Sequence, residues 1–316
     1  MSILEVKNLN LSFKTSDGCY RALHDVCFSI NKGEILALAG ESGCGKTMTA
    51  MSVLRLLPVN AEITSGEIIY KNKNLLFLKE KEMRGIRGKE IALIPQDPAA
   101  SLNPLYTIGS QILEVIELHR GLKGSEAQKA AIEALEQVKI PDAKARLKAY
   151  PHEFSGGMRQ RAAIAIAIAC RPEIIIADEP ATALDVTVQA QITELLKEIK
   201  REMKTSFLFI SHDFGLISET ADRVCVMYNG RIVENASAEE LFKNPKHPYT
   251  QALIKALPDF NSLKLEAIAG MPPSIKEVFP GCPFEPRCAQ RMEKCRNILP
   301  KCTKINDACV MCLKYE

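Results

Sequence analysis

A glycine-rich stretch at residues 40–47 has the residue types and spacing of a loop that binds phosphate groups. Glycines leave the backbone amide groups free to face an anion, and a helix that starts directly after the loop adds its positive end. Within the stretch, the Lys46 ammonium can reach the phosphates and the Thr47 hydroxyl is a ligand for Mg²⁺. An apolar strand at residues 35–39 and a helix at residues 47–57 are expected on either side. The candidate ATP-binding residues of the loop are Gly40, Glu41, Ser42, Gly43, Cys44, Gly45, Lys46 and Thr47.

Two acidic residues stand at the end of a second apolar stretch, residues 174–177. In a core strand beside a phosphate-binding loop, Asp178 would hold Mg²⁺ through water. Glu179 would act as the general base that polarises the attacking water. A strand that ends in two solvated acids is common by itself, but together with the loop the pair favours ATP hydrolysis.

A third motif consists of Ser155, Gly156, Gly157 and Met158. It opens a predicted helix, where amide groups and the helix dipole create a further anion site. A second phosphate site in the same chain would be redundant with the loop at residues 40–47. We therefore expect this motif to contact an ATP molecule that another subunit holds.

In their order along the chain, these motifs resemble those of the ATP-binding subunits of ABC transporters, and the resemblance covers almost the whole chain. It implies that residues 154–161 are the ABC signature, which completes the partner's ATP site in a head-to-tail dimer. The usual signature is Leu-Ser-Gly-Gly-Gln; here Phe154 and Met158 occupy its variable ends, and the serine and both glycines are intact. The implied fold is α/β, a P-loop NTPase (RecA-like) ABC nucleotide-binding domain. It has an antiparallel β-subdomain, an inserted helical subdomain and a cysteine-rich C-terminal extension.

The same resemblance assigns roles to single residues outside these motifs. Gln96 resembles the Q-loop glutamine, which contacts Mg²⁺ and the attacking water, and His212 resembles the switch histidine at the γ-phosphate. Asp185 resembles the D-loop aspartate that links two ATP sites, and a helix N-cap is an equal and compatible role. For adenine stacking, Phe13 fits by its place at the end of the second strand and Tyr20 is its competitor. Core packing is an equal alternative for Phe13.

Composition and periodicity place these motifs in a folded chain with an appendage. The 316 residues carry a formal net charge of +3, with basic residues dispersed along the chain, which gives no support to nucleic-acid binding. Neither a signal peptide nor an apolar run of spanning length is recognisable, so we expect a soluble protein that needs partners for a membrane role. We predict an ABC ATPase domain at residues 1–257, with the helical subdomain inserted at about 98–155, and the cysteine-rich extension at residues 258–316.

Six of the 11 cysteines lie in the last 35 residues. Residues 247–250 and 281–288 look like hallmarks of the branch of oligopeptide, dipeptide and nickel importers, whose extension in some members holds an iron–sulfur cluster. By position, the resemblance implies four ligands: Cys282, Cys288, Cys295 and Cys312. Either Cys302 or Cys309 could replace Cys312. From the residues alone, four thiolates in a reducing compartment suit a [4Fe–4S] cluster or Zn²⁺, and gaps of five and six residues favour the cluster. Unligated structural thiols are the third alternative.

Together these features predict an ATP-hydrolysing subunit that energises the import of peptides across the cytoplasmic membrane. A nickel or other small-solute importer is the alternative within the family, and a soluble, non-transport ABC ATPase is the alternative from another class. The expected partners are a second ABC ATPase subunit, in a homo- or heterodimer, two transmembrane permeases and, indirectly, an extracytoplasmic solute-binding protein. Nucleic acid is not an expected partner. The expected location is the cytoplasmic face of the membrane, with peripheral attachment.

Overall fold

A computed structural model describes residues 2–182, 184–257 and 268–316 of the chain. The contacts divide the chain into two compact units: unit 1 comprises Met1–Leu76 and Ile210–Glu316, and unit 2 comprises Phe77–Phe209. The phosphate-binding loop belongs to unit 1, and so do residues 268–316 of the cysteine-rich extension, hereafter the tail. The two acids and the Ser-Gly-Gly motif belong to unit 2. The predicted domain boundary after residue 257 adjoins residues 258–267, which lie outside the described residues.

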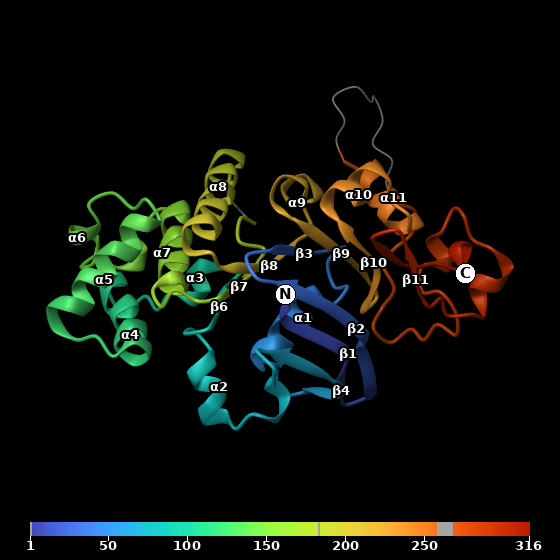
Figure 1. The fold of residues 1–316 in the computed structure, drawn as a ribbon, viewed down its shortest axis with the longest axis horizontal. Coiled ribbons are helices and arrows are strands. Elements are labelled where there is room, and N and C mark those ends of the chain that lie inside the picture. The colour runs from blue at the N-terminus through green and yellow to red at the C-terminus, as the bar shows by residue number, and fades with distance from the viewer. Residues whose placement is uncertain (1, 183, 258–267) are drawn as a thin grey trace. The chain divides into compact units, whose positions relative to one another are not determined.

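Unit 1 begins with an antiparallel sheet in the strand order β2-β1-β4-β5 (Figure 1). Its strands are β1 Ser2–Thr15, β2 Gly18–Asn31, β4 Ala61–Tyr70 and β5 Lys73–Asn74. Asn8 interrupts the regular course of β1 with a φ of 47°, and the side chain of Asn10 donates hydrogen bonds to Asn8 O and Asp25 Oδ1, both at 2.9 Å. This sheet is the antiparallel β-subdomain that the sequence predicts.

A second group of strands in unit 1 carries the phosphate-binding loop. β3 (Ile35–Ala39) is buried along its whole length and runs parallel to β9 (Arg223–Tyr228). β9 forms an antiparallel hairpin with β10 (Arg231–Ser237). The connecting residues Asn229 and Gly230 have φ values of 44° and 72°, which a two-residue hairpin turn of this type requires. The loop thus follows a strand that a neighbouring parallel strand supports.

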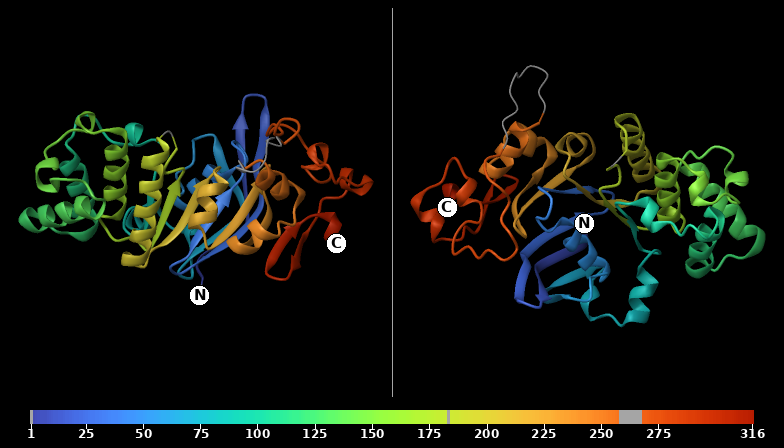
Figure 2. Two further views of the ribbon diagram at one scale, coloured as in Figure 1. Left: turned by 90° about the horizontal axis from the view of Figure 1, so that it is seen from above. Right: turned by 180° about the vertical axis from the view of Figure 1, so that it is seen from behind.

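The C-terminal tail continues this sheet of unit 1. β12 (Ala308–Met311) pairs antiparallel with β10, and it forms a hairpin with β11 (Cys302–Ile305). All three views show the red tail beside the orange helical segment (Figures 1 and 2), and Tyr315 Oη donates a hydrogen bond to Lys246 O at 3.1 Å. The sequence does not predict these two strands, because segments of four residues are too short to display a period of two.

Short helices complete the described part of unit 1. The α-helices are α1 Lys46–Leu54, α9 Phe214–Thr220, α10 Ala238–Lys243 and α11 Pro248–Lys255. The 3₁₀ helices of the tail are η3 Glu285–Arg287, η4 Glu293–Arg296 and η5 Leu313–Tyr315. Another 3₁₀ helix, η1 (Leu75–Phe77), lies where the chain passes from unit 1 to unit 2.

Unit 2 combines a parallel strand pair with a group of helices. β6 (Ile91–Ile94) pairs in parallel with β7 (Ile174–Asp178), and Ile94 lies opposite Ala177, so both strands end at the same edge. The chain returns to unit 1 within β8 (Ser206–Ser211). The helices are α2 Glu80–Ile86, α3 Pro98–Ser101, α4 Ile108–Arg120, α5 Gly124–Gln137, α6 Ala143–Arg146, η2 Pro151–Glu153, α7 Gly156–Ile168 and α8 Val186–Met203.

The helices α3 to α6 fall within the stretch where the sequence predicts an inserted helical subdomain. Figure 1 shows α4 and α5 side by side, next to α7, and Ile112, Ile116 and Leu135 are fully buried on their apolar faces. Apolar residues at helical spacing thus form the helix contacts, as the pattern indicates. The limits of this subdomain stay a prediction.

No helix in the described part of the chain combines the length and the apolar composition that crossing a bilayer requires.

Candidate functional site

The phosphate-binding loop occupies the turn between β3 and α1 in unit 1. Gly40 has a φ of 145°, and a side chain there would meet the backbone oxygen of Met227 on β9 at 2.3 Å. Cys44 O accepts a hydrogen bond from Gly230 N at 2.9 Å, so the β9–β10 turn also holds the loop. Close backbone approach therefore requires glycine at the loop's first position. The sequence predicts the loop from its composition, but not its contacts with Met227 and Gly230.

Lys46 is the first residue of α1 and points back along the loop. Its ammonium donates hydrogen bonds to Gly40 O at 2.8 Å and Glu41 O at 2.9 Å, and the residue is 5% exposed. A buried ammonium held by two carbonyl oxygens is a preformed cation for an anionic ligand. Thr47 follows on the same helix, and its role as a ligand of Mg²⁺ stays a prediction.

Two further residues hold the loop at Glu41, and the sequence predicts neither contact. The Arg287 guanidinium binds the Glu41 carboxylate through two hydrogen bonds of 2.7 and 2.9 Å, and Glu41 N donates to Tyr249 Oη at 3.0 Å. Both partners lie in stretches that carry the family resemblance, residues 247–250 and 281–288. Their separation from the loop, more than 200 residues, removed any local signal of the contact.

In unit 2, the acidic strand end and Gln96 come together. Asp178 is the last residue of β7 and is 2% exposed. Glu179 follows it with a φ of 47°, a conformation that a residue with a side chain adopts at a cost. The Glu179 carboxylate accepts hydrogen bonds from Gln96 Nε2 at 3.2 Å and Thr182 Oγ1 at 3.1 Å. Because β6 and β7 end at the same edge, the residues that follow them can meet.

The Ser-Gly-Gly motif opens α7, as predicted. Ser155 is the N-cap, and its hydroxyl accepts a hydrogen bond from Met158 N at 3.3 Å, while Ser155 and Gly156 are exposed. Phe154, which occupies the position of the usual leucine, is 3% exposed and therefore packs in the core of unit 2. The N-terminus of α7 is thus accessible, and its contact with an ATP molecule on another subunit stays a prediction.

Three other predicted residues lie at element ends or edges. Asp185 is the N-cap of α8, where its carboxylate accepts a hydrogen bond from Val188 N at 3.0 Å, so its predicted cap role is confirmed. His212 is exposed and follows β8, in unit 1. Phe13 and Tyr20 are cross-strand neighbours on β1 and β2, and the ammonium of Lys276 lies 5.2 Å from the centre of the Tyr20 ring.

The four cysteines proposed as cluster ligands lie in the tail of unit 1, and none of them is in a disulfide. The pKa of Cys282 is raised to about 11, mainly by burial and to a smaller extent by the neighbouring thiols of Cys295, Cys312 and Cys288. Burial likewise raises the pKa of Cys288 and of Cys312. In the described residues, however, no group of three or more His, Cys, Asp or Glu side chains is placed to hold a metal ion.

The remaining two cysteines of the tail, Cys302 and Cys309, are joined as a disulfide with a Cα–Cα distance of 5.7 Å. The β11–β12 hairpin brings them within the usual bridging range. This corrects the expectation that the cysteines of the tail are reduced thiols. It also removes both residues as alternatives to Cys312 for a fourth thiolate.

Comparison with known proteins assigns the chain to a family. Residues 23–182 match the model of the ABC transporter family, and residues 233–295 match that of the oligopeptide/dipeptide transporter C-terminal region. The dipeptide transport ATP-binding protein DppD of Bacillus subtilis is 48% identical over 97% of this chain and 92% of its own length. The oligopeptide transport ATP-binding protein OppD of Haemophilus influenzae is 47% identical over 96% of this chain and 94% of its own length.

A solved structure agrees with this assignment. The dimeric ATP-binding cassette MJ0796, bound to ADP and phosphate in a post-hydrolysis state, matches 74% of this chain and 98% of its own chain. Its TM-score is 0.67 and its sequence identity 28%. The P-loop fold of the ABC nucleotide-binding domain is therefore confirmed. The chain belongs to the ABC transporter family, as an ATP-binding subunit of its oligopeptide and dipeptide transporter branch.

Proposed function

We propose that the chain hydrolyses ATP to energise the import of dipeptides or oligopeptides by an ABC transporter. The observation that carries this proposal is the match of both the ATPase body and the C-terminal region to relatives named for peptide transport, at 45–50% identity. The C-terminal match favours peptides over nickel, because its family is named for oligopeptide and dipeptide transporters.

The chain's own residues divide the proposed reaction between binding and proton transfer. The loop at residues 40–47 would bind the phosphates through its amide groups and the Lys46 ammonium. Glu179 would take the proton of the attacking water, and Gln96, which already donates to its carboxylate, would hold that carboxylate in place. His212 would contact the γ-phosphate.

Adenine stacking is assigned to Phe13 in this proposal. The Tyr20 ring already receives the ammonium of Lys276, and this contact occupies one of its faces. Phe13, its cross-strand neighbour, is half-buried and lies on the same hairpin of unit 1.

Mg²⁺ suits the oxygen groups that the sequence singles out, and when bound it neutralises phosphate charge and orients the oxygens. Thr47 offers a hydroxyl, Gln96 an amide oxygen and Asp178 a buried carboxylate, which are hard oxygen donors of the kind this ion prefers. Asp178 would act through water, and Thr47 and Gln96 would bind directly.

The Ser-Gly-Gly motif implies a second subunit in the working molecule. Ser155 and Gly156 are exposed at the start of α7, and MJ0796, the matching solved cassette, is a dimer. The proposed assembly pairs this chain with a second ABC ATPase subunit and two permeases at the cytoplasmic face of the membrane. A solute-binding protein would act on the permeases from outside. Asp185 would link the two ATP sites.

A thiolate-bound [4Fe–4S] cluster in the tail is a further part of the proposal, with Zn²⁺ as its alternative. Four free thiols are a donor set that such a cluster uses, but in the described residues they are not placed close enough together to hold a metal ion. Support for the cluster therefore comes from the family resemblance alone. The disulfide bears only on the choice of ligand, because it leaves Cys312 as the candidate for the fourth thiol. The role of the cluster would be structural, and no step of the ATPase reaction depends on the cluster.

Absorbance of anaerobically purified protein tests this centre. A cluster predicts a broad band near about 400 nm, which Cys282→Ser removes and Cys19→Ser, at an exposed thiol of β2, leaves unchanged. Colourless protein with stoichiometric zinc would assign the site to Zn²⁺, and protein with neither would remove the centre.

Uptake of a labelled dipeptide by vesicles that contain the complete transporter tests the main proposal. Uptake should require ATP on the side of this subunit, and Lys46→Ala should abolish it. Uptake of Ni²⁺ instead of peptide by the same vesicles would replace the peptide assignment with the nickel alternative.

A further inference from the structure

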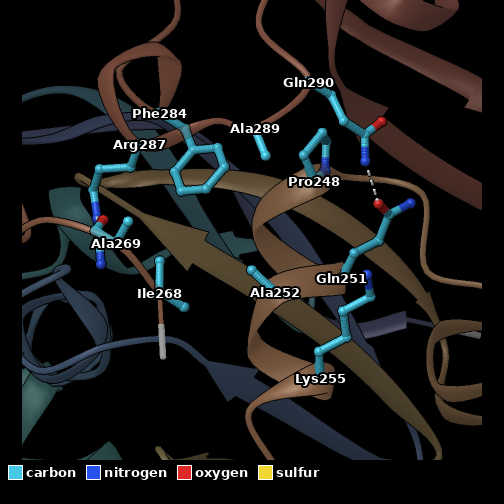
Figure 3. Close-up of a pocket in the computed structure, with 10 residues that line it drawn as sticks. All are labelled: Pro248, Gln251, Ala252, Lys255, Ile268, Ala269, Phe284, Arg287, Ala289 and Gln290. Atoms are coloured by element: carbon cyan, nitrogen blue, oxygen red, sulfur yellow. Dashed lines mark hydrogen bonds between the residues drawn. The ribbon is translucent and has the colours of Figure 1, made fainter. Parts of the chain in front are cut away.

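The C-terminal tail reaches the phosphate-binding loop through one arginine. Arg287 ends η3 of the tail, and its side chain is 6% exposed. Both of its terminal nitrogens donate to the Glu41 carboxylate, at 2.7 and 2.9 Å, and its Nε donates to Ala269 O at 3.0 Å. Figure 3 shows Arg287 extending from the tail toward Ala269, with Phe284 of the same segment beside it. All of these residues belong to unit 1.

An aromatic cluster fixes the direction from which Arg287 approaches. The Phe284 ring lies 5.2 Å from the Tyr228 ring and 5.3 Å from the Tyr249 ring, and the two tyrosines lie 4.7 Å apart. Tyr249 is fully buried and accepts the hydrogen bond from Glu41 N. The backbone and the side chain of Glu41 are therefore both held by residues outside the loop. A position held by packed rings and a bidentate ion pair is restricted in its geometry.

The charge of Glu41 makes this contact relevant to an anionic ligand. A carboxylate at the second position of a phosphate-binding loop repels a polyphosphate unless a cation neutralises it. The Lys46 ammonium lies 2.9 Å from the backbone oxygen of Glu41. If Arg287 did not hold it, the Glu41 carboxylate could therefore pair with Lys46 and compete with the phosphates for this cation. The bond to Glu41 raises the pKa of Arg287, which therefore stays charged at every physiological pH.

We propose that Arg287 is a positioning residue of the nucleotide site, which neutralises Glu41 and keeps its carboxylate away from Lys46 and the phosphates. The C-terminal extension is then a working part of the ATP site in this chain. This inference rests on the proposed binding of ATP by residues 40–47. It assigns to the tail an effect on nucleotide affinity that is separate from any metal centre.

Calorimetric titration of the full chain with ATP and Mg²⁺ tests the inference. Arg287→Met keeps the aliphatic stem and removes the charge, and it should raise the Kd for ATP about tenfold, the effect of losing one charge-assisted contact. Glu41→Gln added to this variant removes the unpaired carboxylate and should return the Kd to within about threefold of wild type. A role of Arg287 in tail packing alone would not be rescued by a change in the loop.

A matched control is available in the same tail. Arg296 pairs with Glu285 at 3.3 Å, and its side chain is 67% exposed, so Arg296→Met removes a tail ion pair without touching the loop. This variant should bind ATP as wild type does. If Arg287→Met does not fold, Arg287→Lys takes its place, because lysine keeps the charge but not the two-nitrogen geometry of the guanidinium. We expect Arg287→Lys to raise the Kd for ATP about threefold, and Glu41→Gln to cancel this rise.

The outcomes separate this inference from the proposed function. Wild-type affinity in Arg287→Met, or a double variant as weak as Arg287→Met, would overturn the inference while ATP binding stands. Failure of the wild-type chain to bind ATP, with a titration indistinguishable from that of Lys46→Ala, would overturn the proposed function itself.

Discussion

The loop in unit 1 and the acidic strand end in unit 2 are built in different ways. Glu179 is held by Gln96 and Thr182, one residue that follows the neighbouring strand and one that lies three residues away. Glu41 and Gly40 of the loop are held by residues about 190 to 250 positions away, from β9, α11 and the tail. The motifs therefore predict the reacting residues in both regions. They do not predict the distant residues that hold the loop.

The largest effect is expected from a substitution at the acidic strand end. Glu179→Gln should lower ATP hydrolysis by a factor of about 10³, because the amide keeps the shape of the carboxylate and cannot accept the proton of water. ATP affinity should be unchanged, since binding is assigned to the loop. Steady-state hydrolysis and calorimetric titration measure the two effects. Glu202→Gln, at an exposed position of α8, is the matched control. Near-normal hydrolysis in the Glu179 variant would remove Glu179 from the role of base.

The next largest effect is expected from a substitution in the phosphate-binding loop. Lys46→Ala should raise the Kd for ATP by a factor of about 100, because the buried ammonium that faces the phosphates is lost. Lys32→Ala, at an exposed turn before β3, should bind ATP as wild type does. If Lys46→Ala lost turnover but kept its affinity, the division into a binding region and a proton-transfer region would be wrong.

These two regions also show what the sequence can and cannot predict. The loop, the two acids and the N-caps at Ser155 and Asp185 follow from local patterns, and the structure contains each of them. The contact of Arg287 with Glu41 and the pairing of β12 with β10 depend on chain segments that meet only in the fold. Local periodicity carries no information about such partners, and one sequence offers no other signal for them.

His247 belongs to the distant residues that support the loop, because it caps the helix that carries Tyr249. This residue is the N-cap of α11, where Nδ1 accepts a hydrogen bond from Tyr249 N at 3.1 Å, and burial lowers its pKa from 6.5 to about 3. The folded state therefore excludes a proton that the unfolded state binds. The stability that neutral His247 contributes is complete above about pH 6.5 and is lost as the pH falls toward 3.

His247→Asn isolates this contribution, because asparagine keeps the N-cap and does not titrate. The variant should be less stable than wild type at pH 7, since the ring packing against Phe284 is lost. The difference in unfolding free energy should shrink by about 2 kcal/mol between pH 7 and pH 5. Urea denaturation at both pH values measures it. The carboxylate of Glu234, which accepts a hydrogen bond from His247 N, is present in both proteins. A difference that does not change with pH would contradict the burial of a neutral His247.

The smallest expected effect separates the two roles of Asp185 in unit 2. Asp185→Ala should lower the free energy of unfolding by about 1 kcal/mol, because Val188 N loses its N-cap acceptor. Asp185→Asn keeps the cap and should restore the stability, which thermal melting measures. If Asp185 also links two ATP sites through its charge, the asparagine variant should hydrolyse ATP more slowly in the assembled dimer while its melting temperature stays at the wild-type value. Equal turnover in Asp185→Asn and wild type would limit Asp185 to the helix cap. Asp178, Glu179 and Gln96 would then be the residues at the acidic strand end that keep a proposed role in ATP hydrolysis.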